Sequence, residues 1–432
     1  MRSLASAVAV LAGFTSPLVA QSIPPVRALG PVTHVSSPGI LGSVSMVRPL
    51  PNGDVIVNDL ARRQLVLLDA KLSKQKLIAD TTMATGKSYG SALAGLIAFS
   101  GDSSLFVEPS SLSMLVIDGK GDVMRVMAAP RPKDVNSMVG GPFGTPAMDP
   151  LGRVVSRSIV KPATVVNYDW LPAKDQLRGK SDDSAFVYRV DLATRVVDTI
   201  AWVKVPVTSM SMTIGQKGRR QAVSRSNPLP VVDDWALMPD GRVAVVRGAD
   251  FHVDWIAMDG RVTSTPKIPY PWERLSADAK QQFLDSLRAV DRLRAEAQLG
   301  NRNDGGAATR SVEGPGPTVG GMVVTGRLEG DNSPPPRPIE YSSDYVLPGD
   351  LPDYRPTFRL GAMRADPDGN LWVRTTMPSK EGAIYYVIND KGQLVDRVKL
   401  PFGRVISGFG PGVVYMGVLD DKGARLEKAR AK

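Results

Sequence analysis

Cysteine is absent from this 432-residue sequence, and histidine occurs only twice, as His34 and His252. Without cysteine the chain can form neither a disulfide nor a thiolate that attacks a substrate or binds a metal. Two histidines are too few for a multi-histidine metal site. A Ser-His-Asp triad would need one of them, and no Gly-x-Ser-x-Gly elbow lies near a strand-helix junction. These absences exclude thiol chemistry and argue against a serine hydrolase.

Long hydrophobic runs are also missing after the N-terminus, since no later segment has the roughly 20 apolar residues that a membrane-spanning helix needs. Residues 1–20 combine Arg2, an apolar stretch at 4–14 and a small residue, Ala20. This order is typical of a signal peptide that is cleaved near Ala20. We therefore expect an exported mature chain that begins near Gln21 and is periplasmic or secreted. Export without disulfides fits a bacterial protein that is stabilised by core burial alone.

Basic residues exceed acidic ones, 53 to 43, which leaves a net charge of +10. Such a balance could favour polyanions such as nucleic acids, anionic lipids or anionic glycans. However, lysine and arginine are scattered, and no run of five or more basic residues occurs. Scattered positive charge is typical of a solvated surface, so we expect no specific nucleic-acid partner. Binding to anionic surfaces through net charge alone would weaken as the salt concentration rises.

Glycine and proline are plentiful, with 41 and 35 residues, as many tight turns require. A Pro-Asp-Gly turn between two apolar stretches, WALMPDGRVAVVR, occupies 235–247. The pattern recurs, in two cases weakly, at four other places: 47–59, 97–107, 147–157 and 363–374. A second turn with an aspartate follows in each unit: Asp69, Asp118, Asp191, Asp259 and Asp390. Each unit is therefore predicted to be a four-stranded antiparallel sheet.

A sixth unit, at 403–430, has only three predicted strands. The segment 26–37 forms an additional predicted strand before the first unit. If it pairs with the sixth unit, the ring closes and the repeat leaves no exposed sheet edge. A two-sheet sandwich would not repeat a whole sheet at intervals of about 45 residues. We therefore predict an all-β fold, a six-bladed β-propeller closed by pairing the N-terminal strand with the last blade, with one helical insertion.

Two units are longer than the others. In the third unit, 161–184 is predicted to be a loop between the second and third strands, and it contains Tyr168 and Trp170. Between the fourth and fifth units, 271–354 is predicted to be an insertion within a propeller that spans 21–432.

The insertion begins with an amphipathic pattern that predicts a helix, with Ser276 as its N-cap and Gly300 as its stop. The segments 301–321 and 329–340 are rich in glycine, proline and serine and have almost nothing to bury. They are predicted to be flexible linker.

The units LPNGDVIVND…LVLLDA, MPDGRVAVVR…VDWIAMDGRV and DPDGNLWVR…YVINDKGQ resemble exported bacterial six-bladed propellers of the NHL-repeat and gluconolactonase-like superfamily. The final GFGPGVVYMGVLDDKGARLEKAR looks like the closing blade of that group. The resemblance covers nearly the whole mature chain except the insertion. The motifs specify the fold but not the function, because this fold occurs in both enzymes and pure binding proteins.

The resemblance also implies a possible metal site. Lactonase-like relatives hold a divalent cation at the channel mouth with an acidic first-blade residue plus asparagine and aspartate. Here the first blade enters through GILGSVSMV, which has no acidic residue. Asp233 and Asp234 could supply oxygen ligands for calcium, and Asn136 could join them. Adjacent acidic pairs are also common on solvated loops. Because the first blade lacks an acidic residue, the metal pattern of the relatives is not reproduced.

The ligand face of a propeller is built by the loops that lead into the innermost strands and those that join second to third strands. The candidate residues that lead into innermost strands are Tyr89, Phe143, Asp233, Asp234, Trp235, Arg359 and Arg404. Those that end second strands are Arg157, Arg247 and Arg374. Several guanidinium groups at one mouth favour an anionic or carboxylate-bearing ligand. Alternatively, these arginines pair with aspartates between blades.

Two functions are compatible with these residues. The favoured hypothesis is an exported binding module that takes a small molecule, a peptide or a protein at the mouth and needs no cofactor. The alternative is a divalent-metal-dependent, lactonase-like hydrolase with bound Ca²⁺. The alternative requires three or four oxygen ligands that converge at the mouth.

Overall fold

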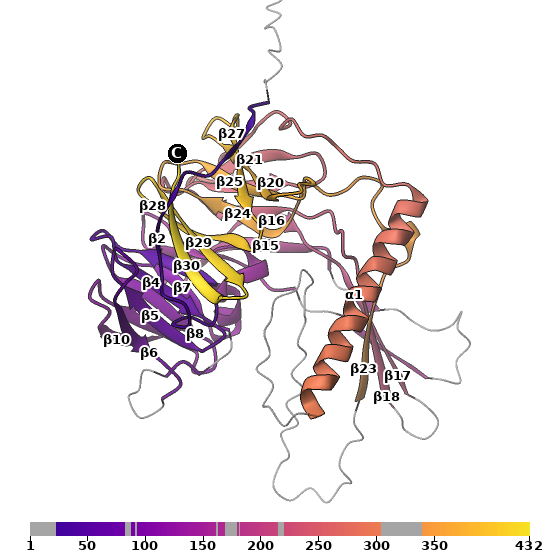
Figure 1. Ribbon diagram of the computed structural model, residues 1–432, viewed down its shortest axis with the longest axis horizontal. Helices are drawn as coiled ribbons and strands as arrows, with labels where there is room; N and C mark the ends of the chain where they lie inside the picture. The colour runs from indigo at the N-terminus through magenta and orange to yellow at the C-terminus, as the bar shows by residue number, and fades with distance from the viewer. Residues whose placement is uncertain are drawn as a thin grey trace, which may run out of the picture.

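The computed structural model describes residues 23–82, 88–90, 93–160, 163–168, 179–180, 182–214, 220–303 and 339–432. The strands in these ranges form seven sheets of four or five strands, accompanied by the α-helix α1 (Ala277–Asn303) (Figure 1). None of the helices in these ranges is both long and apolar enough to cross a membrane. The expected signal peptide at 1–20 and its cleavage near Ala20 lie outside the described residues.

Six of the sheets contain the six predicted units in chain order, and we name them the first to sixth sheets. The first sheet consists of β3 (Met46–Pro49), β4 (Val55–Asp59), β5 (Gln64–Leu68) and β6 (Gln75–Ala79). The second consists of β7 (Gly95–Ala98), β8 (Ser104–Glu108), β9 (Ser113–Ile117) and β10 (Val123–Ala128). The third consists of β11 (Ala147–Met148), β12 (Arg153–Arg157), β15 (Ser184–Asp191) and β16 (Val197–Lys204). The fourth consists of β19 (Asp234–Leu237), β20 (Val243–Arg247), β21 (His252–Ile256) and β22 (Val262–Ser264). The fifth contains β24 (Phe358–Ala365), β25 (Leu371–Thr375), β26 (Gly382–Ile388) and β27 (Leu394–Pro401). The sixth contains β28 (Arg404–Gly410), β29 (Val413–Asp420) and β30 (Gly423–Arg430).

The recurring turns that the sequence indicates are formed by their glycines. Gly53, Gly241 and Gly369 have φ values of 89°, 85° and 82°, a region that side chains with a Cβ rarely adopt. The second recurring turn uses its aspartate as a backbone acceptor, as when Asp118 accepts hydrogen bonds from two amides that follow it. In the fifth sheet this role belongs to Asn389, not to the expected Asp390.

Hydrophobic packing joins each of these sheets to its neighbours. In the described part of the chain, six clusters of buried side chains each join two of the sheets, in the order first–second, second–third, third–fourth, fourth–fifth, fifth–sixth and sixth–first. One large member of each cluster, in that order, is Phe106, Tyr188, Trp235, Tyr386, Met416 and Tyr415. This arrangement is consistent with a β-propeller.

The N-terminal segment divides into two strands. β2 (Val32–Val35) pairs antiparallel with β30, which is the partner expected from the sequence (Figure 1, indigo beside yellow). β1 (Val26–Ala28) instead lies parallel to β27 at the edge of the fifth sheet. The sequence analysis treats 26–37 as one strand and does not anticipate this second pairing.

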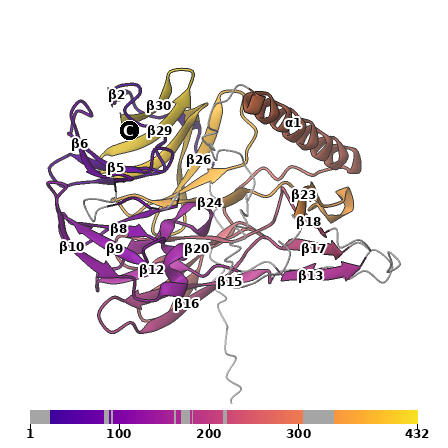
Figure 2. The ribbon, with the colours of Figure 1, turned by 90° about the horizontal axis from the view of Figure 1, so that it is seen from below.

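A seventh sheet was not expected. It contains β13 (Ala163–Tyr168), β17 (Thr208–Ile214), β18 (Arg220–Ser226) and β23 (Ile339–Tyr345), with the short β14 (Gly179–Lys180) beside β17. Two of its pairings, β13 with β17 and β18 with β23, are parallel and join segments far apart in sequence. This sheet and α1 lie on one side of the molecule (Figure 2). The predicted loop at 161–184 and the end of the predicted linker at 329–340 therefore contribute strands, while Trp170 lies outside the described residues.

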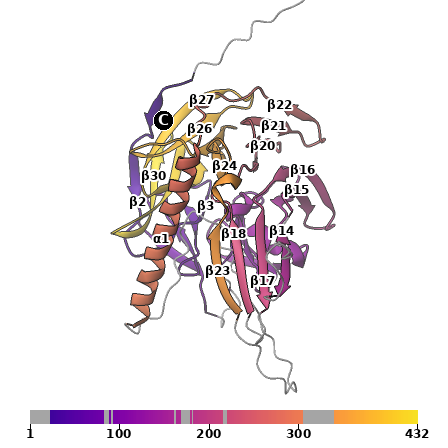
Figure 3. The same ribbon diagram turned by 90° about the vertical axis from the view of Figure 1, so that its right-hand side faces the viewer.

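The predicted helix is present and longer than expected. Its N-cap is Ser276, whose Oγ accepts the Ala279 amide at 3.1 Å, and it continues past Gly300 to Asn303. Leu284 is fully buried in a separate cluster with Leu229, Leu275 and Leu351. α1 and the strands β17, β18 and β23 extend in the same direction (Figure 3). The linker segment 304–338 lies outside the described residues.

Candidate functional site

Asp234 occupies the start of β19, where the fourth sheet meets the fifth. Its side chain is almost completely enclosed, since only 2% of the residue is exposed. One carboxylate oxygen accepts the amides of Ala362 and Met363 in β24, at 2.9 and 3.2 Å. Burial raises the pKa of Asp234 to about 6, although backbone hydrogen bonds and the nearby Arg364 and Arg157 oppose the change. A carboxylic acid that titrates near neutral pH therefore lies between two sheets.

Arg157 lies close to Asp234 from the end of β12 and is also buried, with 5% of the residue exposed. Burial lowers its pKa, and the charge of Asp234 opposes that change. Its guanidinium carbon lies 5.4 Å from the centre of the Phe143 ring. The Trp235 indole donates a hydrogen bond to the Phe143 carbonyl at 3.0 Å. The structure therefore brings together four of the predicted residues, Arg157, Asp234, Phe143 and Trp235.

Arg364 is a functional candidate that the sequence analysis missed. It lies within β24, where only its position next to a recurring turn could have drawn attention to it. Its guanidinium donates to the carbonyls of Gly361 and Met363, at 3.1 and 2.7 Å. Burial lowers the pKa of Arg364, yet part of the residue stays accessible to solvent.

Arg359 follows Phe358 in β24 and Arg374 precedes Thr375 in β25, and Phe358 pairs with Thr375 just before the register of the two strands shifts. Both arginines are exposed. Within the described ranges, neither forms a hydrogen bond or an ion pair. Partial burial lowers the pKa of Arg359, and the positive charges of Arg374 and Arg355 lower it further. We call Arg359, Arg364 and Arg374 the arginine cluster.

Asp233 and Arg247 form a separate network. Asp233 accepts Arg247 at 2.8 Å with one oxygen and the Gly248 amide at 3.1 Å with the other. Arg247 also donates to Asp254 at 2.7 Å. Partial burial alone would lower the pKa of Arg247, but the hydrogen bonds to Asp254 and Asp233 raise it overall. For Arg247, the geometry matches the alternative of pairing with aspartates.

The remaining candidates lie apart from the arginine cluster. Arg404 forms a bidentate pair with the buried Glu427, at 2.7 and 3.0 Å. Tyr89 is fully buried, and its hydroxyl donates to Asn58 Oδ1 at 2.6 Å. Tyr89 belongs to a Gly-Lys-Ser-Tyr-Gly sequence at 86–90, but the next described element is the strand β7, so the strand-helix context of a nucleophile elbow is missing.

The possible calcium ligands do not converge. Asp233 and Asp234 are consecutive residues with different partners, because one accepts Arg247 and the other accepts amides of β24. Asn136 is exposed in the 3-10 helix η2 (Pro132–Val139). No group of three or more His, Cys, Asp or Glu side chains that could hold a metal occurs among the described residues. These residues do not fit a Ca²⁺ ion, which takes six to eight oxygen ligands.

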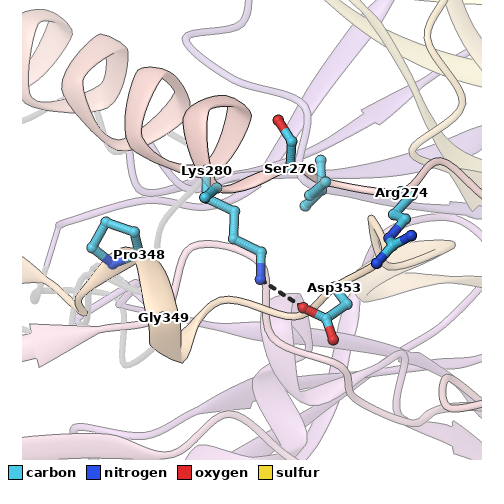
Figure 4. A pocket seen from close by; sticks show the side chains of 8 residues that line it. Arg274, Ser276, Lys280, Pro348, Gly349 and Asp353 are labelled. Atoms are coloured by element: carbon cyan, nitrogen blue, oxygen red, sulfur yellow. Dashed lines mark hydrogen bonds and ion pairs between the residues drawn. The ribbon is translucent and has the colours of Figure 1, made fainter.

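A cavity of about 520 Å³ lies at the start of α1 (Figure 4). Lys280 crosses it to donate to Asp353 Oδ1 at 2.8 Å and to the Leu351 carbonyl at 3.0 Å. Lys280 lowers the pKa of the exposed Asp353 carboxyl through this hydrogen bond. Because its buried ammonium group is already paired, this cavity is a weaker anion site than the arginine cluster.

Comparisons with known proteins were made for the whole chain. No protein-family model matches it, and no curated protein matches it in sequence. A solved member of the DUF4221 family from Bacteroides vulgatus has a TM-score of 0.50 and 10% identity, and the match covers 95% of this chain and 99% of that one. A gluconolactonase from Xanthomonas campestris has a TM-score of 0.40 and 10% identity over 96% and 99% of the two chains. Virginiamycin B lyase from Staphylococcus aureus has a TM-score of 0.39 and 10% identity over 92% and 98%. Likeness at this level of identity concerns the fold alone.

Proposed function

We propose that the first to sixth sheets are the blades of one closed propeller, that β2 completes the last blade, and that 271–354 is an insertion between the fourth and fifth blades. The support is the series of six hydrophobic clusters, which returns from the sixth sheet to the first. The pairing of β2 with β30 supplies the fourth strand of the last sheet. We also infer that the mature chain is exported, on the basis of the signal-peptide pattern at 1–20.

We propose further that the protein is a binding module that takes an anionic ligand at the arginine cluster. The observation that carries this proposal is the absence of any partner for Arg359 and Arg374 in the described part of the chain, although each is next to one member of the Phe358–Thr375 pair and the charge of Arg374 acts on Arg359. Like charges at close range repel each other, so an anion bound between them relieves an unfavourable interaction. Guanidinium groups bind carboxylates and phosphates through two parallel hydrogen bonds, which favours ligands with these groups.

The test is calorimetric titration of the full chain with citrate, a compact polycarboxylate. Arg359→Ala and Arg374→Ala are each expected to weaken citrate binding by about 10- to 100-fold, because charge-assisted hydrogen bonds contribute about 1.5–3 kcal/mol each. The matched control is Arg261→Ala, which removes an exposed arginine that is paired with Asp259 at the β21–β22 turn. Equal citrate affinity for all four proteins, or no binding by the unaltered chain, would contradict the proposal.

The alternative, a divalent-metal-dependent lactonase-like hydrolase, corresponds to the name of the Xanthomonas campestris neighbour. The names of the neighbours fit this alternative at least as well as a binding module. The described residues do not provide the metal ligands that this hydrolase needs, however, because Asp233 already accepts a hydrogen bond from Arg247 and Asn136 lies in η2.

Addition of calcium distinguishes the binding module from the metal-dependent hydrolase. A cation bound only by the folded chain stabilises it by about 2.7 kcal/mol at a concentration 100 times its Kd. We expect 5 mM CaCl₂ to leave the melting temperature unchanged, with NaCl at the same ionic strength as the control. A rise in melting temperature that Asp234→Asn abolishes would instead favour the hydrolase.

A further inference from the structure

A series of aromatic rings leads from the core to the surface between the fourth and fifth sheets. The ring of Tyr270 packs against the buried Phe251 and Tyr386, with centres 5.6 and 5.9 Å away. Trp272 packs edge-on to Tyr270 at 5.7 Å, and Tyr354 packs edge-on to Trp272 at 6.4 Å. The last two residues are 39% and 48% exposed. We call Trp272 and Tyr354 the aromatic pair.

The aromatic pair is held in place by the two ends of the insertion. Arg274 and Tyr354 form an antiparallel bridge, and the Arg355 amide donates to the Glu273 carbonyl at 2.9 Å. The Arg355 side chain also forms a bidentate pair with Glu273, at 2.6 and 3.1 Å. Both rings are therefore fixed on a paired backbone, and they present apolar surface to solvent at positions where the fold restricts their motion.

The aromatic pair and the arginine cluster lie on neighbouring segments of the chain. Tyr270, which supports Trp272, places its hydroxyl 3.5 Å from the Thr376 hydroxyl, two residues beyond Arg374. Arg355 directly follows Tyr354, and its charge acts to lower the pKa of both Tyr270 and Arg359. Exposed rings are thus combined with the guanidinium groups of Arg359 and Arg374, which have no carboxylate partner among the described residues.

Tyr270 has a structural role because it covers the core, but this role does not account for the positions of Trp272 and Tyr354. Tyr270 is half-buried and packs directly on the core cluster of the fourth and fifth sheets. In the described part of the chain, Trp272 and Tyr354 are not among the side chains packed against that cluster, and ring contacts join them to it through Tyr270. Both leave much of their surface in water. Large aromatic side chains that are exposed yet fixed in position are typical of binding surfaces.

We propose that this surface binds an acidic oligosaccharide, a chain of uronic acid residues. The faces of Trp272 and Tyr354 would pack against the C–H faces of pyranose rings, while Arg359 and Arg374 bind the carboxylates of the sugar. This inference rests on the proposed anion-binding function and names its ligand class. Single-stranded nucleic acid is the competing polyanion, but successive bases stack on parallel faces, whereas these two rings are inclined at 86° to each other.

The experiment is calorimetric titration of the full chain with trigalacturonate, with maltotriose as the neutral counterpart and a short oligothymidylate as the nucleic-acid probe. Trp272→Ala and Tyr354→Ala are each expected to weaken trigalacturonate binding by about 5- to 10-fold, since aromatic contacts contribute roughly 1 kcal/mol. Both variants should bind citrate like the unaltered chain, and Trp272→Phe should retain most of the affinity for the sugar. The control is Trp202→Ala, which removes a 59% exposed tryptophan of β16.

The outcomes distinguish this inference from the function on which it rests. The sugar site alone is overturned if citrate binding depends on Arg359 but the affinity for trigalacturonate is the same in Trp272→Ala, Tyr354→Ala and the unaltered chain. Equal affinity for maltotriose, or tighter binding of the oligothymidylate, also overturns it. If the unaltered chain does not bind citrate, the proposed anion-binding function itself is contradicted. Melting curves of each variant show whether an affinity change reflects unfolding.

Discussion

A chain that begins at Pro38 instead of Gln21 is expected to lose on the order of 5 kcal/mol of its free energy of unfolding, because several backbone hydrogen bonds disappear at about 0.5–1.5 kcal/mol each. The truncation removes β2, whose partner β30 then becomes an unpaired edge. It also removes Ser36, which is buried and exchanges hydrogen bonds with the backbone of Leu426 at 2.9 and 3.0 Å. An exposed edge strand promotes association between chains, so the truncated protein should also aggregate.

Urea denaturation followed by circular dichroism measures this loss, and light scattering measures the aggregation. A chain that begins at Gly30 is the matched control, because it lacks β1 but keeps β2. It loses the backbone pairing of β1 with β27 over three residues and the partly exposed pair between Arg27 and Asp396, which contributes only about 0.2–1 kcal/mol. It is therefore expected to lose less stability than the chain that begins at Pro38. If both truncations cost the same, or if the loss of β2 costs less than 1 kcal/mol, β2 does not close the ring.

The second large effect concerns Asp234 and pH. Between pH 3.5 and 7, the free energy of unfolding of the unaltered chain is expected to fall by about 3 kcal/mol relative to that of Asp234→Asn. Burial raises the pKa of Asp234 from the ordinary value of 3.8 to about 6 in the folded chain. Between these two values the folded chain binds a proton that the unfolded chain does not, so stability decreases as the pH rises through this window. Asparagine cannot titrate, yet its amide oxygen can still accept the Ala362 and Met363 amides.

Urea denaturation at half-unit pH steps provides the comparison. Asp259→Asn is a suitable control, because Asp259 is exposed and a backbone hydrogen bond from Arg261 lowers the pKa of its carboxyl. For a lowered pKa the sign is opposite, so this variant should lose stability relative to the unaltered chain as the pH rises through the acidic range. A difference between Asp234→Asn and the unaltered chain that stays constant from pH 3.5 to 7 would mean that Asp234 is not enclosed as described.

Local signals were sufficient to predict the repeated sheets. Gly53, Gly241 and Gly369 have positive φ values, and the apolar stretches on either side of these turns form antiparallel pairs. A tight turn and the strands next to it depend on residues close together in sequence, which makes such pairing visible in a single chain. The helix that begins after Ser276 was predicted for the same reason. The expected stop at Gly300 was wrong, because the helix continues to Asn303.

The seventh sheet could not be predicted in this way. Its parallel pairs join β13 to β17 and β18 to β23, and no turn in the sequence marks either pairing. Its central strand, TSMSMTI, alternates small polar and apolar residues without the strong β-branched pattern of the other sheets. Pairing between distant segments depends on where the rest of the fold places them, and this information is not local.

The sequence by itself determined the repeated strand-turn-strand units, the absence of thiol chemistry and the helix of the insertion, because each depends on composition or on neighbouring residues. Only the tertiary structure decided which charged residues of the candidate site remain without partners. Asp233 and Asp234 are adjacent in the chain, but one accepts Arg247 and the other accepts β24. Arg247 and Arg374 end equivalent strands, yet among the described residues Arg247 pairs with aspartates and Arg374 does not. The pairing of a charge depends on which distant strand the fold brings within a few ångströms of it.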